Sequence, residues 1–350
     1  MKKLSVLLLV ISCTLFAACS KHVAEKDNCG CFVSLSDAKA DAKQNNRNIL
    51  FMITNEGGDV TSSAFISNVV MSEEFKESLG QEFTVFHWDA SQAAFEKTVA
   101  PENATKEEID AAKKAETTMT ENLNYAVNIG GGAYSPQFYI LSKEGYPILE
   151  VQYEDFEDEI NTADFSILVH GYNEPVKMFN SMIDATKTGS KEERLKAIDN
   201  VYTTTNELYR IEMIDLWKEG VSLDKKNESG ITGKFIYSIA ESDAADKFNN
   251  NDSEGAIKLL VETADNPALG GEEIQQCYYL AAYLMSVTGS TDFQLMADYL
   301  YKSYEAAPNT EIAPSIQGTA DYYKDFDPNT MIDLDFEDSG IEISGLEGSE

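Results

Sequence analysis

Short apolar runs divide the first half of the chain into predicted strands. Residues 49–53 are continuously apolar over strand length, which is typical of a strand buried on both faces of a parallel sheet. Residues 83–89 are predicted to form a second strand. Two further runs, 137–141 and 148–151, flank Lys143-Glu144-Gly145, and a short Gly-containing turn between apolar runs indicates a hairpin. The pattern predicts a small mixed sheet.

Helical patterns separate these strands. Ser36-Asp37 are expected to cap a first helix, residues 61–70 form a second, and Ser72 opens a third. Between the second strand and the hairpin, residues 91–128 are predicted to be a helical insertion, in which Thr105 and Glu108 have the spacing of a capping box. This helix is polar and charged, so we expect it to be mainly a solvated addition to the domain.

The second half of the chain reads as helical throughout. Residues 191–209 carry apolar side chains at helical spacing, and a further helix covers 212–218. The segment 224–230 contains Asp224 and Glu228 and ends in glycine, but aligning Gly230 with the glycine of a calcium loop places Lys225 and Ile236 at ligand positions. It is therefore expected to be a capped turn between helices.

Two stretches of the second half are similar to each other. Residues 250–260 and 289–300 place Ala256 and Ala297 41 positions apart, which is near the period of helical-hairpin repeats. With Pro308 after its second helix, the later stretch resembles a tetratricopeptide repeat. That resemblance implies a concave surface for peptides or proteins, and the alternative is an ordinary helical bundle. Residues 187–325 are thus expected to be a helical, tetratricopeptide-like domain.

The first half resembles a known family in the order of its elements and in two segments. Residues 133–141, with Gly145 after them, are similar to the cis-proline segment of the thioredoxin fold, and residues 69–75 resemble the segment after its active-site helix. The resemblance covers about 32–186 and implies an α/β thioredoxin-like domain, in which Pro136 is the cis-proline. The predicted fold class is therefore this domain followed by an all-α domain.

The resemblance fails where the family carries its chemistry. Its Cys-x-x-Cys motif would lie near residues 60–63, where the chain has Val-Thr-Ser-Ser and no cysteine. Without a thiolate there is no nucleophile for disulfide exchange, and Ser62 and Ser63 have no histidine or lysine nearby in sequence to activate them. We expect these serines to be helix-terminal hydroxyls and the protein not to be an enzyme.

The N-terminus predicts where the protein is found. Two lysines precede an apolar stretch that is too short to span a membrane comfortably, so residues 1–18 are interpreted as an export signal. Phe16-Ala17-Ala18-Cys19 resembles the lipobox of bacterial lipoproteins, which implies cleavage before Cys19, acylation of Cys19 and a membrane anchor in the cell envelope. The alternative is ordinary secretion. Residues 19–31 would then tether the folded domains.

Cys29 and Cys31 are the one close cysteine pair of the mature chain. The pair allows three interpretations: a redox-active dithiol, a structural pair or two incidental thiols. It precedes the predicted fold and does not lie on the expected active-site helix, so catalysis is the least favoured of the three.

Charge and composition exclude several classes of function. The net charge of −33 argues against nucleic acid as a partner, because phosphate binding needs an excess of Lys and Arg. The histidines His22, His87 and His170 show no metal-ligand spacing, so no metal or other cofactor is expected. Residues 326–350 are acidic and rich in Gly and Ser, and are predicted to be a disordered tail.

These observations favour a membrane-anchored envelope lipoprotein, periplasmic or surface-facing, that acts as a protein-interaction or chaperone-like module with an unidentified protein or peptide partner. Two alternatives stay open at this point. One is an envelope thiol-disulfide oxidoreductase that uses Cys29 and Cys31, and the other is a solute-binding lipoprotein.

Overall fold

The computed structural model describes residues 24–132, 135–153 and 160–326. The chain divides into two compact units, Met1–Leu216 and Trp217–Glu350. We expected the helical domain to begin at residue 187, whereas the boundary between the units falls 30 residues later. The predicted signal peptide, Cys19 and the acidic tail beyond Phe326 lie outside the described residues.

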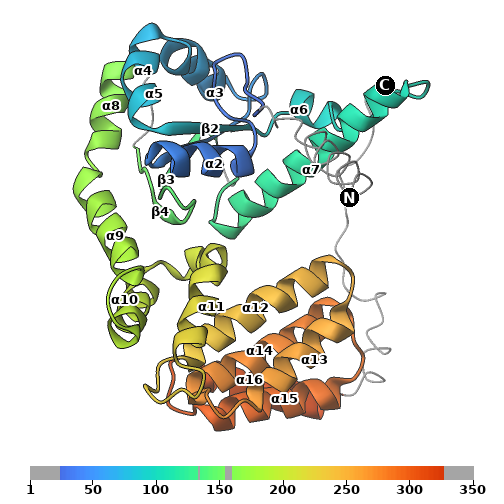
Figure 1. Cartoon of the computed structure of the whole chain (residues 1–350). Coiled ribbons are helices and arrows are strands. Elements are labelled where there is room, and N and C mark those ends of the chain that lie inside the picture. The colour runs from blue at the N-terminus through green and yellow to red at the C-terminus, as the bar shows by residue number, and fades with distance from the viewer. Residues whose placement is uncertain (1–23, 133–134, 154–159, 327–350) are drawn as a thin grey trace, which may run out of the picture. The chain divides into compact units, whose positions relative to one another are not determined.

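A four-stranded mixed sheet lies at the centre of the first unit (Figure 1). Its strands are β1 (Ile49–Thr54), β2 (Thr84–Asp89), β3 (Gln137–Leu141) and β4 (Pro147–Glu150), in the spatial order β2-β1-β3-β4. β1 pairs in parallel with β2 and antiparallel with β3, which pairs antiparallel with β4. The structure confirms the predicted strands and the parallel pairing of the first two.

Both faces of this sheet are covered, because alternate residues of a strand point to opposite faces. Leu50 and Met52 pack under α3 (Val60–Phe65), the π-helical turn η1 (Ile66–Val70), α4 (Glu73–Glu77), α5 (Leu79–Glu82) and α8 (Thr162–His170). Phe51 and Ile53 pack under α2 (Leu35–Asn45) and α7 (Lys106–Asn128). Burial on both faces explains why β1 carries apolar side chains without alternation.

The insertion between β2 and β3 is more than a solvated addition. It consists of α6 (Gln92–Glu96) and α7, and α7 begins with the predicted capping box of Thr105 and Glu108. Tyr125 and Ala126, near the end of α7, are buried in the core on one face of the sheet. The expectation of a mainly solvated helix was wrong for this C-terminal part, because its apolar face completes the core.

Helices after the sheet extend the first unit. They are α9 (Asn173–Thr186), α10 (Lys191–Thr204), the 3-10 segment η2 (Glu207–Met213) and the start of α11 (Ile214–Leu223). The helix expected over 191–209 ends at Thr204, where Thr205 takes an extended backbone conformation. The side chain of Asn206 then accepts the N–H of Leu208. Ser, Thr and Asn side chains compete in this way with helix hydrogen bonds.

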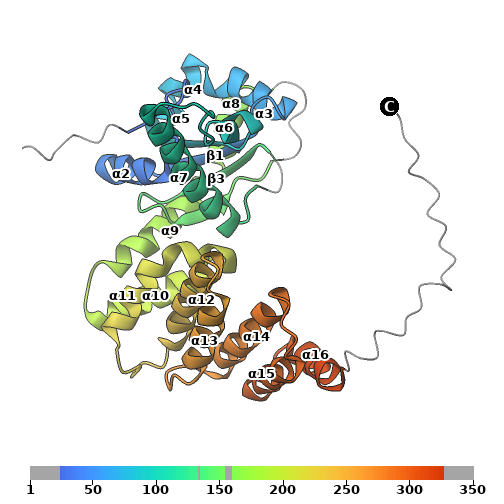
Figure 2. The ribbon, with the colours of Figure 1, turned by 90° about the vertical axis from the view of Figure 1, so that its right-hand side faces the viewer.

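The second unit is helical (Figure 2). Its helices α12 (Gly233–Asn249), α13 (Ser253–Ala264), α14 (Gly271–Val287), α15 (Phe293–Ala306) and α16 (Ala313–Asp325) each pack against the next, and α12 also contacts α14. Short connections make neighbours antiparallel. The predicted turn precedes them, with the Asp224 carboxylate accepting the N–H groups of Glu228 and Ser229.

Glycine allows the first turns of α12 and α14 to approach other backbone segments closely. A Cβ atom on Gly233 would lie 2.4 Å from the Ala268 carbonyl oxygen, and one on Gly271 would lie 2.4 Å from that of Ala306. Larger side chains at Gly233 or Gly271 would collide with these carbonyl oxygens. Among the described residues, no helix has the length and apolar character needed to cross a bilayer.

Candidate functional site

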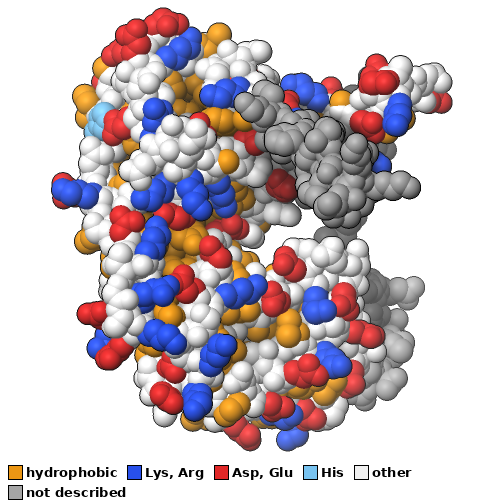
Figure 3. All heavy atoms as spheres, viewed as in Figure 1, with side chains coloured by type: hydrophobic (Ala, Val, Ile, Leu, Met, Phe, Trp, Pro, Cys, Tyr) orange, Lys and Arg blue, Asp and Glu red, His pale blue; other side chains and the backbone are white. Residues whose placement is uncertain are grey.

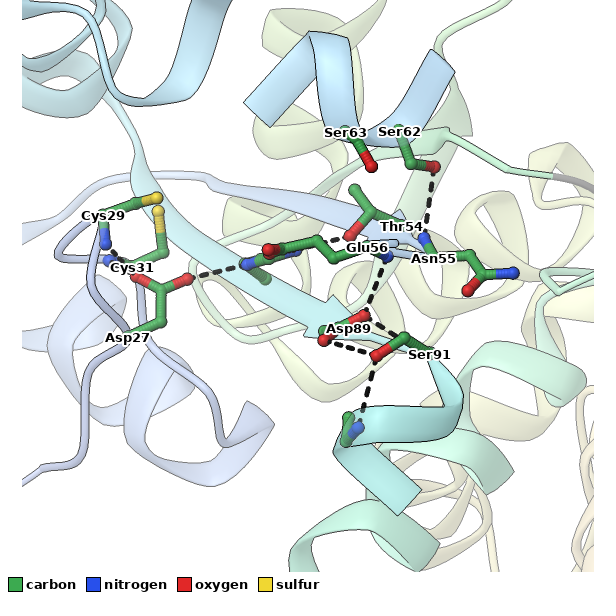
Figure 4. A network of polar contacts seen from close by, with 12 residues as sticks. Asp27, Cys29, Cys31, Thr54, Asn55, Glu56, Ser62, Ser63, Asp89 and Ser91 are labelled. Atoms are coloured by element: carbon green, nitrogen blue, oxygen red, sulfur yellow. Dashed lines mark hydrogen bonds and ion pairs between the residues drawn. The ribbon is translucent and has the colours of Figure 1, made fainter. Parts of the chain in front are cut away.

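Polar side chains gather where β1 and β2 end, next to the N-terminus of α3 (Figure 4). The last residues of these parallel strands, Thr54 and Asp89, are register partners. Asp89 organises the loops that follow, because its carboxylate accepts the N–H of Glu56 at 3.1 Å and the hydroxyl of Ser91 at 2.8 Å. Loops at the C-terminal end of parallel strands are frequent places for binding and catalysis.

Asp59 occupies the N-terminus of α3, beside the segment where the family's redox motif is expected. Its carboxylate accepts the N–H groups of Ser62 at 2.7 Å and Thr61 at 3.3 Å. Burial raises the pKa of Asp59, but hydrogen bonds from Ser62, Thr61 and the Ser135 side chain outweigh this, so that its pKa lies below the ordinary value. A carboxylate that caps a helix in this way is a hydrogen-bond acceptor and supplies no thiol chemistry.

The two serines of this helix act as structural hydroxyls, as the sequence predicts. Ser62 is fully buried and accepts the N–H of Asn55 at 3.1 Å. Ser63 donates to the Asp59 carbonyl at 2.9 Å and accepts the N–H of Gly57 at 3.1 Å. Both hydroxyls hold the loop before α3, and the bonds described for them include none to a histidine or lysine.

The proline predicted to be cis lies in the segment that meets this helix. The peptide bond between Ser135 and Pro136 is cis, as the family resemblance implies. Ser135 contacts the Asp59 carboxylate, and the Pro136 carbonyl accepts the hydroxyl of Tyr153. The structure thus brings the cis peptide bond between Ser135 and Pro136 close to the N-terminus of α3.

A buried histidine lies at the centre of the network. His87 is only 3% exposed; its Nδ1 lies 2.7 Å from Asp27 Oδ2 and its Nε2 lies 2.8 Å from Thr54 Oγ1. The order carboxylate, imidazole, hydroxyl is that of a hydrolase triad. Thr54, however, is fully buried in the sheet, so no substrate reaches its hydroxyl, and we assign the network a structural role.

The sequence pattern does not reveal this network. His87 and Asp27 are 60 residues apart, and Asp27 lies in the segment expected to be a tether. One signal was present: His87 stands between the large apolar residues Phe86 and Trp88 in a predicted strand. A histidine at such a position is buried, and buried polar groups need hydrogen-bond partners.

Cys29 and Cys31 lie beside the network and are held by the same carboxylate. Asp27 Oδ1 accepts the N–H of Cys29 at 2.8 Å and that of Cys31 at 2.9 Å, and the two sulfur atoms lie near each other (Figure 4). Both thiols are free, and Cys31 is buried in the core.

The electrostatic surroundings disfavour ionisation of these thiols. Burial, followed by the negative charges of Asp27 and Glu56, raises the pKa of Cys29 to about 11. Burial and Asp27 raise the pKa of Cys31 even further. At neutral pH the nucleophilic thiolate form of both cysteines is therefore scarce.

Acidic and thiol groups near His87 do not assemble a metal site. Glu56 Oε1 lies 3.8 Å from His87 Nε2. Burial raises the pKa of Glu56; His87 opposes this shift, and the negative charges of Asp89 and Asp27 add to it. Within residues 24–132, 135–153 and 160–326, no group of three or more His, Cys, Asp and Glu side chains is placed to hold a metal ion.

Comparisons with known proteins cover parts of the chain. A family model described as an uncharacterised protein C-terminal domain matches residues 231–325, which correspond to the helices of the second unit. No curated protein matches the sequence. A solved structure titled "DsbH Oxidoreductase" is similar to the chain at 15% sequence identity and a TM-score of 0.26, covering 46% of this chain and 96% of that chain. A TM-score of this size implies neither an activity nor a substrate.

Proposed function

We propose that the protein is a lipid-anchored envelope protein whose thioredoxin-like domain lacks disulfide-exchange activity and whose helical domain binds segments of other proteins. The observation that carries this proposal is the Asp59 carboxylate at the N-terminus of α3, next to the cis-proline segment. In a redox-active member of the family, a thiolate would use the same helix N-terminus to lower its pKa.

The chemistry of the available thiols supports the same proposal. Cys29 and Cys31 lie away from the N-terminus of α3, and their raised pKa values leave little thiolate to attack a disulfide. Ser62 and Ser63 hold backbone groups. Oxidoreductase activity of the Cys29/Cys31 pair is therefore the less favoured function.

Membrane attachment rests on the lipobox resemblance of residues 16–19. One acyl chain holds a protein only weakly at a bilayer, whereas two or more hold it stably. Acylation of Cys19 would thus keep both units at the membrane of the cell envelope. Replacing Cys19 with Ala should abolish acyl labelling and detergent partitioning.

Exposed aromatic side chains support a binding role for the helical unit. Tyr279, Tyr283 and Val287 are 41%, 53% and 49% exposed and follow one another every four residues along α14, which places them on one helix face. Tyrosine is enriched in protein interfaces because it buries a large area with little loss of conformational entropy.

The proposal is tested by the ability of the chain from Ser20 to Glu350 to keep an unfolded protein soluble. Light scattering of reduced, aggregating lysozyme would be followed with and without the protein. We expect suppression of aggregation, and equal suppression by the Cys29→Ser, Cys31→Ser variant. If suppression is absent, or requires the two cysteines, the proposed function is wrong.

A further inference from the structure

A groove runs along the helical unit between α13 and α15. Its volume is about 760 Å³. Ile257 and Val261 on α13 and Leu295 and Tyr299 on α15 line its walls, and Met285 on α14 contributes to its floor. Successive wall residues are four positions apart on each helix, so two apolar stripes face one another across the groove.

The edges of this groove are acidic. Three carboxylates, those of Glu254, Glu262 and Asp292, line it together with a single lysine, Lys258. Lys258 lies 3.7 Å from Glu262, and both side chains are largely exposed, so this pair neutralises little of the surrounding field. Figure 3 shows apolar side-chain atoms among charged ones on the surface of this unit.

The geometry points to a docking groove for a basic amphipathic helix of a partner protein, an inference that rests on the proposed binding function. An apolar stripe on such a helix would enter between α13 and α15, while its flanking Lys or Arg residues would meet Glu254, Glu262 and Asp292. Helices recognise grooves in this way through apolar anchors one turn apart. The flexible thioether of Met285 on the floor adapts to different anchors.

Exposure and length favour a helix over a small solute. The wall residues Ile257, Val261 and Tyr299 are half-buried and Leu295 is 36% exposed, so the groove is open along its length and would leave a small ligand largely in water. α13 has 12 residues, about 18 Å of helix, and a partner helix of three turns matches that length.

Charge disfavours the chain's own C-terminal segment as the occupant. Residues 327–350 carry many Asp and Glu residues and no Lys or Arg. They would meet the carboxylates of the groove with like charge, which costs free energy at an interface. A basic helix from another protein has the complementary charge.

The test is fluorescence anisotropy with a labelled synthetic helix of about 14 residues, roughly 21 Å long, carrying Leu one turn apart and Lys on both flanks. The chain from Ser20 to Glu350 is expected to bind it. A peptide with Ser in place of Leu, or Glu in place of Lys, should bind at least about tenfold more weakly. Equal binding of all three peptides would overturn the proposal.

Matched protein variants locate the site. Leu295→Lys on α15 should weaken binding at least about tenfold, whereas Ile312→Lys, at an exposed apolar position outside the groove, should leave it unchanged. Glu262→Lys changes an exposed edge residue and should also weaken binding without affecting the fold. If Ile312→Lys weakens binding and Leu295→Lys and Glu262→Lys do not, the groove is the wrong site.

Two further outcomes separate this inference from the function on which it rests. If the peptide does not bind at a concentration of about 1 mM but aggregation is still suppressed, the docking groove is wrong and the proposed function stands. If neither peptide binding nor suppression of aggregation is observed, both the docking groove and the proposed function are wrong. Tight binding only after removal of residues 327–350 would assign the groove to the chain's own tail and also overturn the inference.

Discussion

His87 Nδ1 lies 2.7 Å from Asp27 Oδ2, and this contact fastens the segment before the fold to the second strand of the sheet. The same carboxylate accepts the N–H groups of Cys29 and Cys31. Residues that read as part of a tether are therefore integrated into the first unit. Asp27 links the cysteine pair to the polar network at the ends of β1 and β2.

Replacing Asp27 with Asn should lower the free energy of unfolding by about 1–2 kcal/mol, because a charged acceptor of several hydrogen bonds is lost. The effect is limited to this size because the Asp27 side chain is partly exposed to water. Urea denaturation measures the change. Asp110→Asn, at an exposed position of α7, is the control for loss of one negative charge and should change stability little. Equal effects of the two substitutions would contradict the assigned role of Asp27.

The contribution of Asp27 should depend on pH in a defined direction. Burial raises its pKa, but the hydrogen bond and charge of His87 and the N–H groups of Cys31 and Cys29 outweigh this, so its folded pKa lies below 3.8. A carboxylate whose pKa is lower in the folded state stabilises the fold at pH values above its pKa in the unfolded state. This stabilisation is lost as the pH falls through the pKa of the folded state. The stability difference between wild type and Asp27→Asn should therefore narrow from pH 5 to pH 3, as followed by denaturation at each pH. A difference that widens would contradict this sign.

Substitutions at Asp59 test its role as a helix cap. Asp59→Ala should destabilise the protein by about 1 kcal/mol, because the N–H groups of Thr61 and Ser62 lose their acceptor, whereas Asp59→Asn should cost less than half as much. Thermal unfolding of both variants gives the comparison. Equal losses would show that the side-chain oxygen is not the stabilising feature.

The thiol of Cys29 should react slowly at ordinary pH. Its pKa of about 11 predicts iodoacetamide labelling at pH 8 at least about a hundredfold slower than that of an ordinary thiol. The chain from Ser20 to Glu350 with Cys31→Ser and Cys277→Ser isolates this group, and the same variant in denaturant is the control. A native rate equal to the denatured rate would show that the thiol is not perturbed.

The elements that depend on local sequence pattern are predictable from the sequence. The apolar runs gave β1 to β4, and the Thr105–Glu108 spacing gave the start of α7. Features that depend on contacts between residues distant in sequence are not predictable in this way. The burial of Tyr125 follows from packing on the sheet, and η2 contacts α7 and β4, which extends the first unit beyond residue 186.

The candidate site was predicted less completely. The missing cysteines at 60–63 were evident from the sequence, and so was the position of Pro136. The capping carboxylate of Asp59 and the link between His87 and Asp27 depend on the conformation of loops. The periodicity of apolar residues along the sequence predicts helices and strands but not loop conformations. The thiol pKa values likewise depend on how deeply Cys29 and Cys31 are buried beside Asp27.

Insulin reduction tests the central claim most directly. The chain from Ser20 to Glu350 would be assayed with dithiothreitol as reductant, beside its Cys29→Ser, Cys31→Ser variant. The account predicts equal rates, both at the uncatalysed background, because Asp59 caps the helix that would activate a thiolate and the available thiols ionise poorly. A rate well above background that disappears in the double variant would contradict it and make Cys29 and Cys31 an active site.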